Sequence, residues 1–123
     1  MELPGETNPA AIRWGTMQGQ GEELRKLRTY FKALGDVARL QILRHLAHTP
    51  ELSVSGLARL LHLSQPLVSW HLRRLERVGL IRVRKEGRQR YYSLDWQRLR
   101  AYQEEFAHLI GEGGDRGVTW PDE

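Results

Sequence analysis

The chain has 123 residues, carries a net charge of +4 and contains no cysteine. This length is enough for one modest hydrophobic core, and the lack of cysteine excludes disulfides, thiolate metal sites and cysteine nucleophiles. No apolar run approaches the roughly 20 residues that cross a bilayer, and Met1–Gly5 lacks the form of a secretory signal, so we expect a soluble, cytoplasmic protein without a membrane partner.

Two tails that contain glycine and proline are predicted to flank a single domain. Residues 1–21 combine these residues with little apolar periodicity, which is typical of a flexible arm. The glycine-containing run from Gly111 to Pro121 cannot continue a helix, so residues 111–123 are predicted to form a second flexible tail. The folded domain is therefore expected to span residues 22–110.

In the first half of this domain, apolar side chains recur at the three- and four-residue spacing of helices. The first predicted helix carries Leu24, Leu27, Phe31 and Leu34. Asp36 is a good N-cap residue for a second helix, which Pro50 ends. A short extended link at residues 53–55 then leads to a third, short helix at residues 57–61.

The second half predicts a fourth helix, a β-hairpin and a fifth helix. Ser64 is the expected N-cap of the fourth helix, and Gly79 ends it. Extended segments within residues 80–94 turn at Glu86 and Gly87, and Asp95 begins the last helix. The predicted fold class is therefore mainly α with a small β-hairpin (α+β), with five helices in all.

Two short helices joined by a tight turn and followed by a basic hairpin are typical of the winged helix-turn-helix, in which the second helix enters the DNA major groove. If Val68, Leu72 and Leu75 face the core, polar and basic side chains face outward. Between Arg73 and Arg90 eight cations are offset only by Glu76 and Glu86. The candidate DNA-binding residues are Ser64, Gln65, Pro66, Ser69, Trp70, His71, Arg73, Arg74, Arg77, Lys85, Arg88 and Arg90.

Individual roles follow from side-chain chemistry. Gln65 can pair with adenine, and Ser69 can form a hydrogen bond to a base or a phosphate. Trp70 can contact thymine methyl groups. Arg73 can read guanine or hold a phosphate. His71 looks structural, at the edge of the helix, where it is expected to bond to the backbone or to a phosphate. The arginines alone are more typical of a solvated helix face, but the adjacent basic hairpin favours DNA. The alternative function is a winged helix that docks an acidic protein partner.

Long segments of the chain also resemble a known family. They are FKALGDVARLQILRHL at Phe31–Leu46, LSVSGLARLLHLSQPLVSWHLRRLERVGLIRVRKEGRQRYYSL at Leu52–Leu94, and the helix that follows Asp95. Together they resemble the ArsR/SmtB-type bacterial repressors, and only the two tails fall outside the match. The resemblance implies a homodimer built from the first and last helices, repression of a nearby promoter, and release of DNA on an inducing signal that the sequence does not specify.

Apolar stripes on the first and last helices independently suggest a second copy. The inner elements of so small a chain can fill its core, so part of these stripes should bury against another protomer. A two-fold dimer then predicts a palindromic operator on double-stranded DNA. The expected dimerisation residues are Leu24, Leu27, Phe31, Leu99, Tyr102, Phe106 and Leu109.

Metal sites and catalysis are not predicted. The resembled family often binds metals through cysteines or through an Asp-x-His pair in the last helix, but Trp96 and Arg98 stand where that pair is expected, and His108 is the only histidine there. His45 and His48 have a spacing that can hold a metal, although surface histidines are commoner. No phosphate-binding glycine loop or Ser/His/Asp arrangement occurs, so neither a cofactor nor an enzyme is expected.

Overall fold

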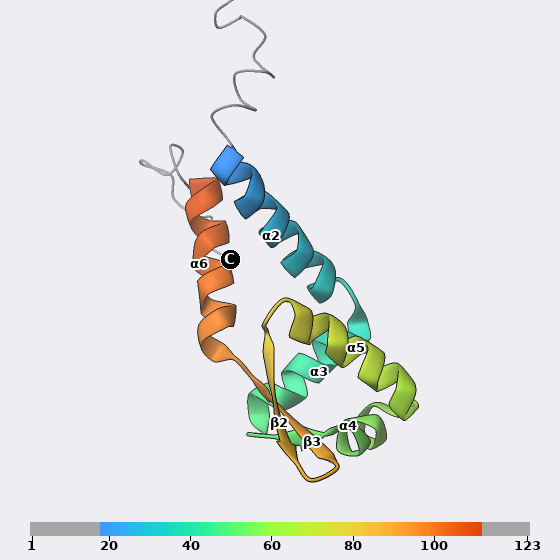
Figure 1. The fold of residues 1–123 in the computed structure, drawn as a ribbon. Coiled ribbons are helices and arrows are strands. Elements are labelled where there is room, and N and C mark those ends of the chain that lie inside the picture. Colours follow the sequence, from blue (N-terminus) through green and yellow to red (C-terminus); the bar gives the residue numbers. More distant parts are fainter. Residues whose placement is uncertain (1–17, 112–123) are drawn as a thin grey trace, which may run out of the picture.

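The computed structural model describes residues 18–111, which form helices and one antiparallel sheet (Figure 1). In chain order the elements are α2 (Gln18–Leu34), α3 (Val37–His48), β1 (Leu52–Ser53), α4 (Val54–Leu61), α5 (Gln65–Arg77), β2 (Ile81–Glu86), β3 (Gln89–Leu94) and α6 (Trp96–Gly111). The predicted fold class, mainly α with a hairpin, is confirmed. α2 begins within the segment that was assigned to the N-terminal arm, whereas residues 1–17 and 112–123 lie outside the described region.

Short polar side chains start four of the helices by capping free backbone N–H groups. Asp36 Oδ1 accepts hydrogen bonds from the amides of Ala38 and Arg39 at 2.8 and 3.3 Å. Ser64 Oγ accepts from Leu67 N at 3.3 Å, and Asp95 Oδ1 from Arg98 N at 3.0 Å. These three caps were predicted. The fourth, Ser53 Oγ with Gly56 N at 3.1 Å, was not.

The sheet has three strands in the described region, one more than the sequence predicted. β2 and β3 form the expected hairpin, with Ile81 opposite Leu94 and Glu86 opposite Gln89. The turn uses Gly87 in the left-handed region, at φ +61. The predicted link at residues 53–55 is wrong, because Leu52 and Ser53 pair with β3 as strand β1 and α4 begins directly at Val54. A two-residue strand is too short to show alternation.

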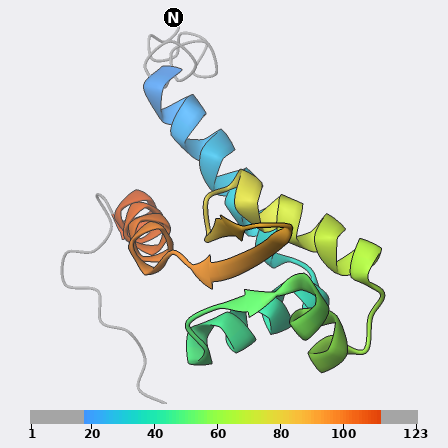
Figure 2. The ribbon, with the colours of Figure 1, turned by 60° about the horizontal axis from the view of Figure 1, so that its bottom comes forward.

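The core lies where α3, α4 and α5 meet the sheet. Its fully buried side chains are Ile42, Leu57, Val68, Leu72, Leu75 and Leu80, so the predicted inward face of α5 is confirmed. α2 and α6 extend from this body toward the same end of the molecule (Figure 1), and the second view shows α6 standing apart from α3 and α4 (Figure 2). The two helices contact each other through Tyr30 and Tyr102, whose rings stack with centroids 4.2 Å apart.

No helix among the described residues is long and apolar enough to cross a membrane.

Candidate nucleic-acid interface

The outward face of α5 carries most of the predicted DNA-binding side chains. The exposed or half-buried members of that set on α5 and at its cap are Ser64, Gln65, Pro66, Ser69, Trp70, Arg73, Arg74 and Arg77. The first turn of α5, from its N-cap Ser64 to Leu67, is exposed. Polar and basic groups therefore project from the side of α5 that faces away from the core.

His71 does not belong to this face, so its predicted contact is wrong. Its side chain is buried, with 5% exposed, and its Nδ1 lies 3.1 Å from Nη1 of Arg39 and 4.0 Å from Oδ1 of Asp36. A guanidinium can only donate, so Nδ1 accepts and the neutral ring carries its proton on Nε2. Burial lowers the pKa of His71, which keeps this neutral form.

The exposed Trp70 is held by two arginines, on the flank of α5 that faces away from the β2–β3 hairpin. The Arg74 guanidinium lies 4.6 Å from the centre of the Trp70 ring, and that of Arg39 lies 5.6 Å away. Such cation–π contacts contribute about 0.5–1 kcal/mol at exposed sites. Trp70 therefore orients Arg74, its neighbour one helical turn on, whereas its contact with Arg39 could not be predicted from helical spacing because Arg39 lies on α3.

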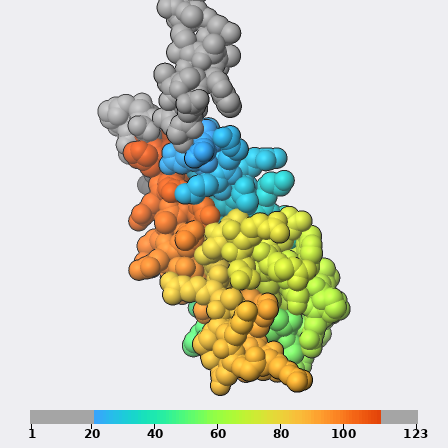
Figure 3. Space-filling view, viewed as in Figure 1, coloured from blue at the N-terminus to red at the C-terminus, as the bar shows by residue number. Residues whose placement is uncertain are grey.

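The β2–β3 hairpin, which we call the wing, stands beside α5 on one face of the molecule (Figure 3). A groove of about 390 Å³ separates them, lined by Val54, Ser55, Gln65, Ser69, Arg88, Gln89 and Arg90. None of these described residues is acidic. The groove thus brings hydrogen-bonding side chains of α5 next to two cations of the wing. This combination suits an anionic ligand that also presents hydrogen-bond donors and acceptors.

The wing carries less free positive charge than the sequence count indicated. Arg82 Nε donates to Asp95 Oδ2 at 3.0 Å. Arg84 donates through Nε and Nη2 to both carboxylate oxygens of Glu51 at 2.8 Å, and through Nη1 to Glu86 at 2.7 Å. The hydrogen bond from Arg84 lowers the pKa of Glu51 below its usual value. Glu51 and Asp95 lie outside the stretch from Arg73 to Arg90, so the count of acidic residues within that stretch missed both.

Three wing cations remain exposed and without an ion pair in the described part of the chain: Lys85, Arg88 and Arg90. They are the three that the sequence analysis selected. Arg82 and Arg84 lie on the face of β2 opposite the half-buried Val83, where their carboxylate partners hold them. The cations available for a ligand are therefore concentrated at and beside the turn of the wing.

The residues expected at a dimer interface divide into two groups. Leu24, Phe31 and Phe106 are exposed, and Leu99 and Leu109 are half-buried. Leu27 and Tyr102 are instead core residues of the protomer itself, with 2% and 6% exposed, so their predicted role as interface surface is wrong.

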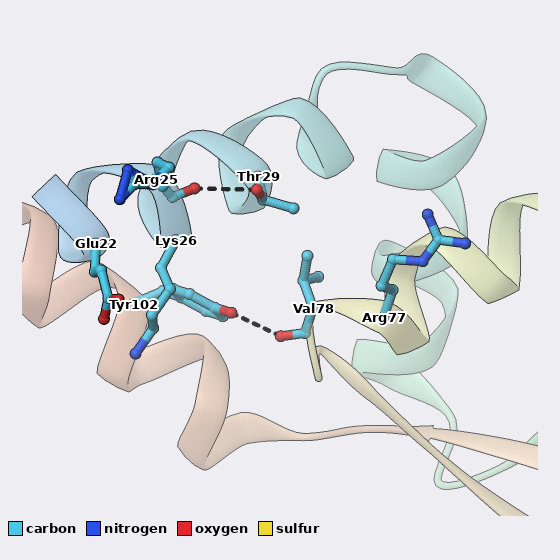
Figure 4. A pocket seen from close by; sticks show the side chains of 7 residues that line it. All are labelled: Glu22, Arg25, Lys26, Thr29, Arg77, Val78 and Tyr102. Carbon is cyan, nitrogen blue, oxygen red and sulfur yellow. Dashed lines mark hydrogen bonds between the residues drawn. The ribbon is translucent and has the colours of Figure 1, made fainter.

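Tyr102 links the last helix to the end of α5. Its hydroxyl donates a buried hydrogen bond of 2.8 Å to the carbonyl of Val78, the C-cap of α5 (Figure 4). This bond satisfies one of the carbonyls that a helix end leaves free. The predicted apolar stripe on α6 could not show it, because the hydroxyl reaches an acceptor 24 residues away.

The two histidines considered for a metal lie on α3. His45 is half-buried, and exposed His48 donates from Nδ1 to the carbonyl of Arg44 at 2.8 Å. Among residues 18–111 there is no group of three or more His, Cys, Asp or Glu side chains that could hold a metal ion.

Comparisons with known proteins agree with this geometry. Residues 36–83 match the model of the bacterial regulatory protein arsR family. The chain is 38% identical over 71 residues to the uncharacterized HTH-type transcriptional regulator MJ1325 of Methanocaldococcus jannaschii, which covers 58% of this chain and 80% of that protein. It is 36% identical over 89 residues to the transcriptional repressor SmtB homolog of Synechocystis sp., covering 72% of this chain and 67% of that protein.

A third relative is the transcriptional activator HlyU of Vibrio cholerae, which is 43% identical over 70 residues, covering 57% of this chain and 64% of HlyU. The structure of reduced HlyU superposes with a TM-score of 0.58 at 34% identity, over 76% of this chain and 96% of that one. The chain therefore belongs to the ArsR family of bacterial regulatory proteins, transcriptional regulators with a winged helix-turn-helix DNA-binding fold.

Proposed function

We propose that this protein is a repressor that binds a palindromic operator as a homodimer, with α5 in the major groove and the wing on the flanking backbone. The observation that carries the proposal is the groove between α5 and the wing, in which Gln65, Ser69, Arg88 and Arg90 converge. Base edges are read by hydrogen-bonding side chains and phosphates are held by cations. The groove offers both kinds of group side by side.

In this proposal the side chains in the first turns of α5 recognise the base sequence of the operator. Gln65 pairs with adenine, and Ser69 bonds to a neighbouring base or phosphate. Arg73 is exposed on the same outward face, and its guanidinium forms a bidentate pair of hydrogen bonds with guanine. Ser64 and Pro66 fix the approach of the helix N-terminus, and Arg77 lies further along the exposed side.

Lys85, Arg88 and Arg90 contact the phosphate backbone beside the groove. Their side chains are exposed and have no ion pair in the region that the structure describes. Because phosphate contacts carry no base information, these cations supply affinity rather than preference. Trp70 supports Arg74 on the other flank of α5 and contacts the DNA at its exposed edge.

The homodimer forms through the apolar side chains that α2 and α6 leave exposed. Phe31 and Phe106 meet edge to face at 4.9 Å on this surface, and Leu24 and Ile110 are exposed on the same two helices. Residues 22–110 then act as one DNA-binding and dimerisation domain. Two-fold symmetry places the two α5 helices in successive major grooves, about 34–36 Å apart, which sets the spacing of the half-sites.

Repression requires only that the bound dimer occupies promoter DNA. Of the relatives above, one is named a repressor and one an activator. We propose repression because occupancy of the promoter needs no contact beyond those of α5, the wing and the dimer. Transcription from the protein's own promoter in a purified system, with and without the protein, decides between the two directions of regulation.

Binding is tested by fluorescence anisotropy on a labelled duplex from the upstream region of the gene, with a scrambled duplex of equal composition, across a salt series. We expect preference for the native duplex and a steep loss of affinity with salt, because each neutralised phosphate releases counterions. Equal, weak binding to both duplexes would refute the proposal in favour of an acidic protein partner. Sedimentation of the complex gives the number of protomers on each duplex.

A further inference from the structure

A second basic surface lies on the flank of α5 away from the wing. It is a cleft of about 180 Å³ between α2, α3 and α5, which we call the α2–α5 cleft. The cleft is lined by Arg28, Thr29, Lys32, Ala33, Arg39, Arg74, Arg77 and Val78. Five of these eight described residues are cations and none is acidic.

The cations of the cleft lack the carboxylate partners that neutralise those of the wing. Arg82 and Arg84 each form ion pairs with carboxylates at 3.0 Å or less. Within residues 18–111, no carboxylate oxygen lies within 4.0 Å of the charged nitrogens of the five cleft cations. Positive charges gathered without counter-charges repel one another, and a bound anion relieves this repulsion.

Two of the guanidinium groups are held in position before any ligand binds. Arg39 is 8% exposed and donates from Nε to Ala33 O at 2.7 Å, from Nη1 to His71 Nδ1 at 3.1 Å and from Nη2 to Lys32 O at 3.4 Å. A guanidinium has five N–H donors, so two remain after these three bonds. The ring of Trp70 lies against both Arg39 and Arg74.

The neighbouring pocket differs from the cleft because carboxylates lie at it or beside it. A pocket of about 410 Å³ between α2, α6 and the end of α5 shares Thr29, Arg77 and Val78 with the cleft (Figure 4). Glu22 lines this pocket, and Lys26 there is paired with Glu105 at 3.9 Å. Arg25 in this pocket has Glu22 as an acidic neighbour in the lining, whereas the cleft around Arg28, Lys32 and Arg74 has no acidic lining residue among those described.

We propose that the α2–α5 cleft binds a phosphate group. A phosphate offers the charge and the several acceptor oxygens that guanidinium and ammonium donors match. A helix in the major groove has a phosphate strand on each side, so a strand on the flank opposite the wing is one source of this group. A free phosphate-bearing molecule is the other. The first source rests on the proposed function, whereas the second does not.

The test variant is Arg28→Ala combined with Lys32→Ala. Both side chains are exposed on α2, outside the proposed base-reading face, and alanine favours helix. Arg44→Ala combined with Arg100→Ala removes the same charge from exposed positions that do not line the cleft, and serves as the control. Thermal melts of both variants establish that they fold.

The first arm measures the salt dependence of DNA binding. If the cleft holds a backbone phosphate, the slope of log affinity against log salt falls by about 1 in the cleft variant and its preference for the native duplex stays unchanged. The control keeps the wild-type slope. This combination assigns the phosphate of the cleft to DNA.

The second arm titrates the DNA-free protein with inorganic phosphate and pyrophosphate by calorimetry, against chloride at equal ionic strength. Binding by the wild type that the cleft variant loses and the control keeps, together with an unchanged salt slope, assigns the site to a free phosphate. If the cleft variant matches the control in both arms, the proposal is overturned. A wild-type protein that binds phosphate but shows no duplex preference would refute the proposed function while leaving the cleft site standing.

Discussion

Removing the Tyr102 hydroxyl should lower the stability of the protein by about 1–3 kcal/mol, the cost of leaving a buried acceptor without its hydrogen bond. The hydroxyl donates to Val78 O at 2.8 Å, and both groups are buried. Tyr102→Phe keeps the ring, which stacks on Tyr30 with an angle of 13° between the planes. The substitution therefore removes the hydrogen bond and leaves the packing in place.

The measurement is urea unfolding followed by circular dichroism. A loss of about 1 kcal/mol lowers the melting temperature of a domain of this size by about 4–8 °C, so thermal melts give an independent check. All proteins are compared at the same concentration, because association of two copies would add to the apparent stability. An unchanged denaturant slope shows that the midpoint shift reflects stability alone.

Tyr91→Phe is the matched control. Tyr91 is half-buried and its ring faces Arg84 at 4.8 Å, but its hydroxyl makes no hydrogen bond in the described part of the chain. We expect this variant to lie within about 0.5 kcal/mol of the wild type. If Tyr102→Phe were as mild as Tyr91→Phe, the bond to Val78 would not hold α6 to the end of α5, and that part of the structural argument would fail.

Three further predictions concern α5 and the wing. Burial lowers the pKa of His71, against a smaller opposing effect of Asp36, so the unfolded chain binds a proton more readily than the folded one. The stability of the protein should therefore fall as the pH drops below about 6.5. His71→Gln should make the urea midpoint less dependent on pH in this range. Arg73→Ala should cost about 1–3 kcal/mol on the native duplex and relax base preference, whereas Arg88→Ala should weaken binding to all duplexes alike in anisotropy titrations. Gly79→Ala should destabilise by about 1–2 kcal/mol in urea unfolding, because φ is +80 and the added Cβ would lie 2.9 Å from Arg98 Nη1.

The features that could be predicted from the sequence depend on nearby residues. A capping side chain such as Asp36 or Ser64 bonds to an amide two or three residues ahead, so its type and position already indicate the helix start. The inward stripe of α5 follows from helical spacing in the same way. The exposed wing cations were found because a hairpin turn exposes whatever side chains surround it.

Apart from the Ser53 cap, the side-chain contacts that were missed depend on partners far apart in the chain. Arg84 pairs with Glu51, which lies 33 residues earlier, and His71 accepts from Arg39, which lies 32 residues earlier. A periodic pattern shows which face of a helix is apolar, but it does not show which polar atom a neighbouring element brings to that face. His71 was therefore placed with the DNA contacts on α5, although Arg39 of α3 holds it in the interior.

These distant partners also determine how α5 is held relative to α2 and α6. On one flank, Arg39 connects the carbonyls of Lys32 and Ala33, at the end of α2, to His71 in the middle of α5. At the other end, Tyr102 of α6 binds the C-cap carbonyl of α5. Each bond is buried or partly buried, so breaking it leaves a polar group without a partner and costs more than the bond itself contributes. The orientation of α5 is thus determined by directional contacts to the two helices with exposed apolar faces, in addition to the core packing of its inward stripe.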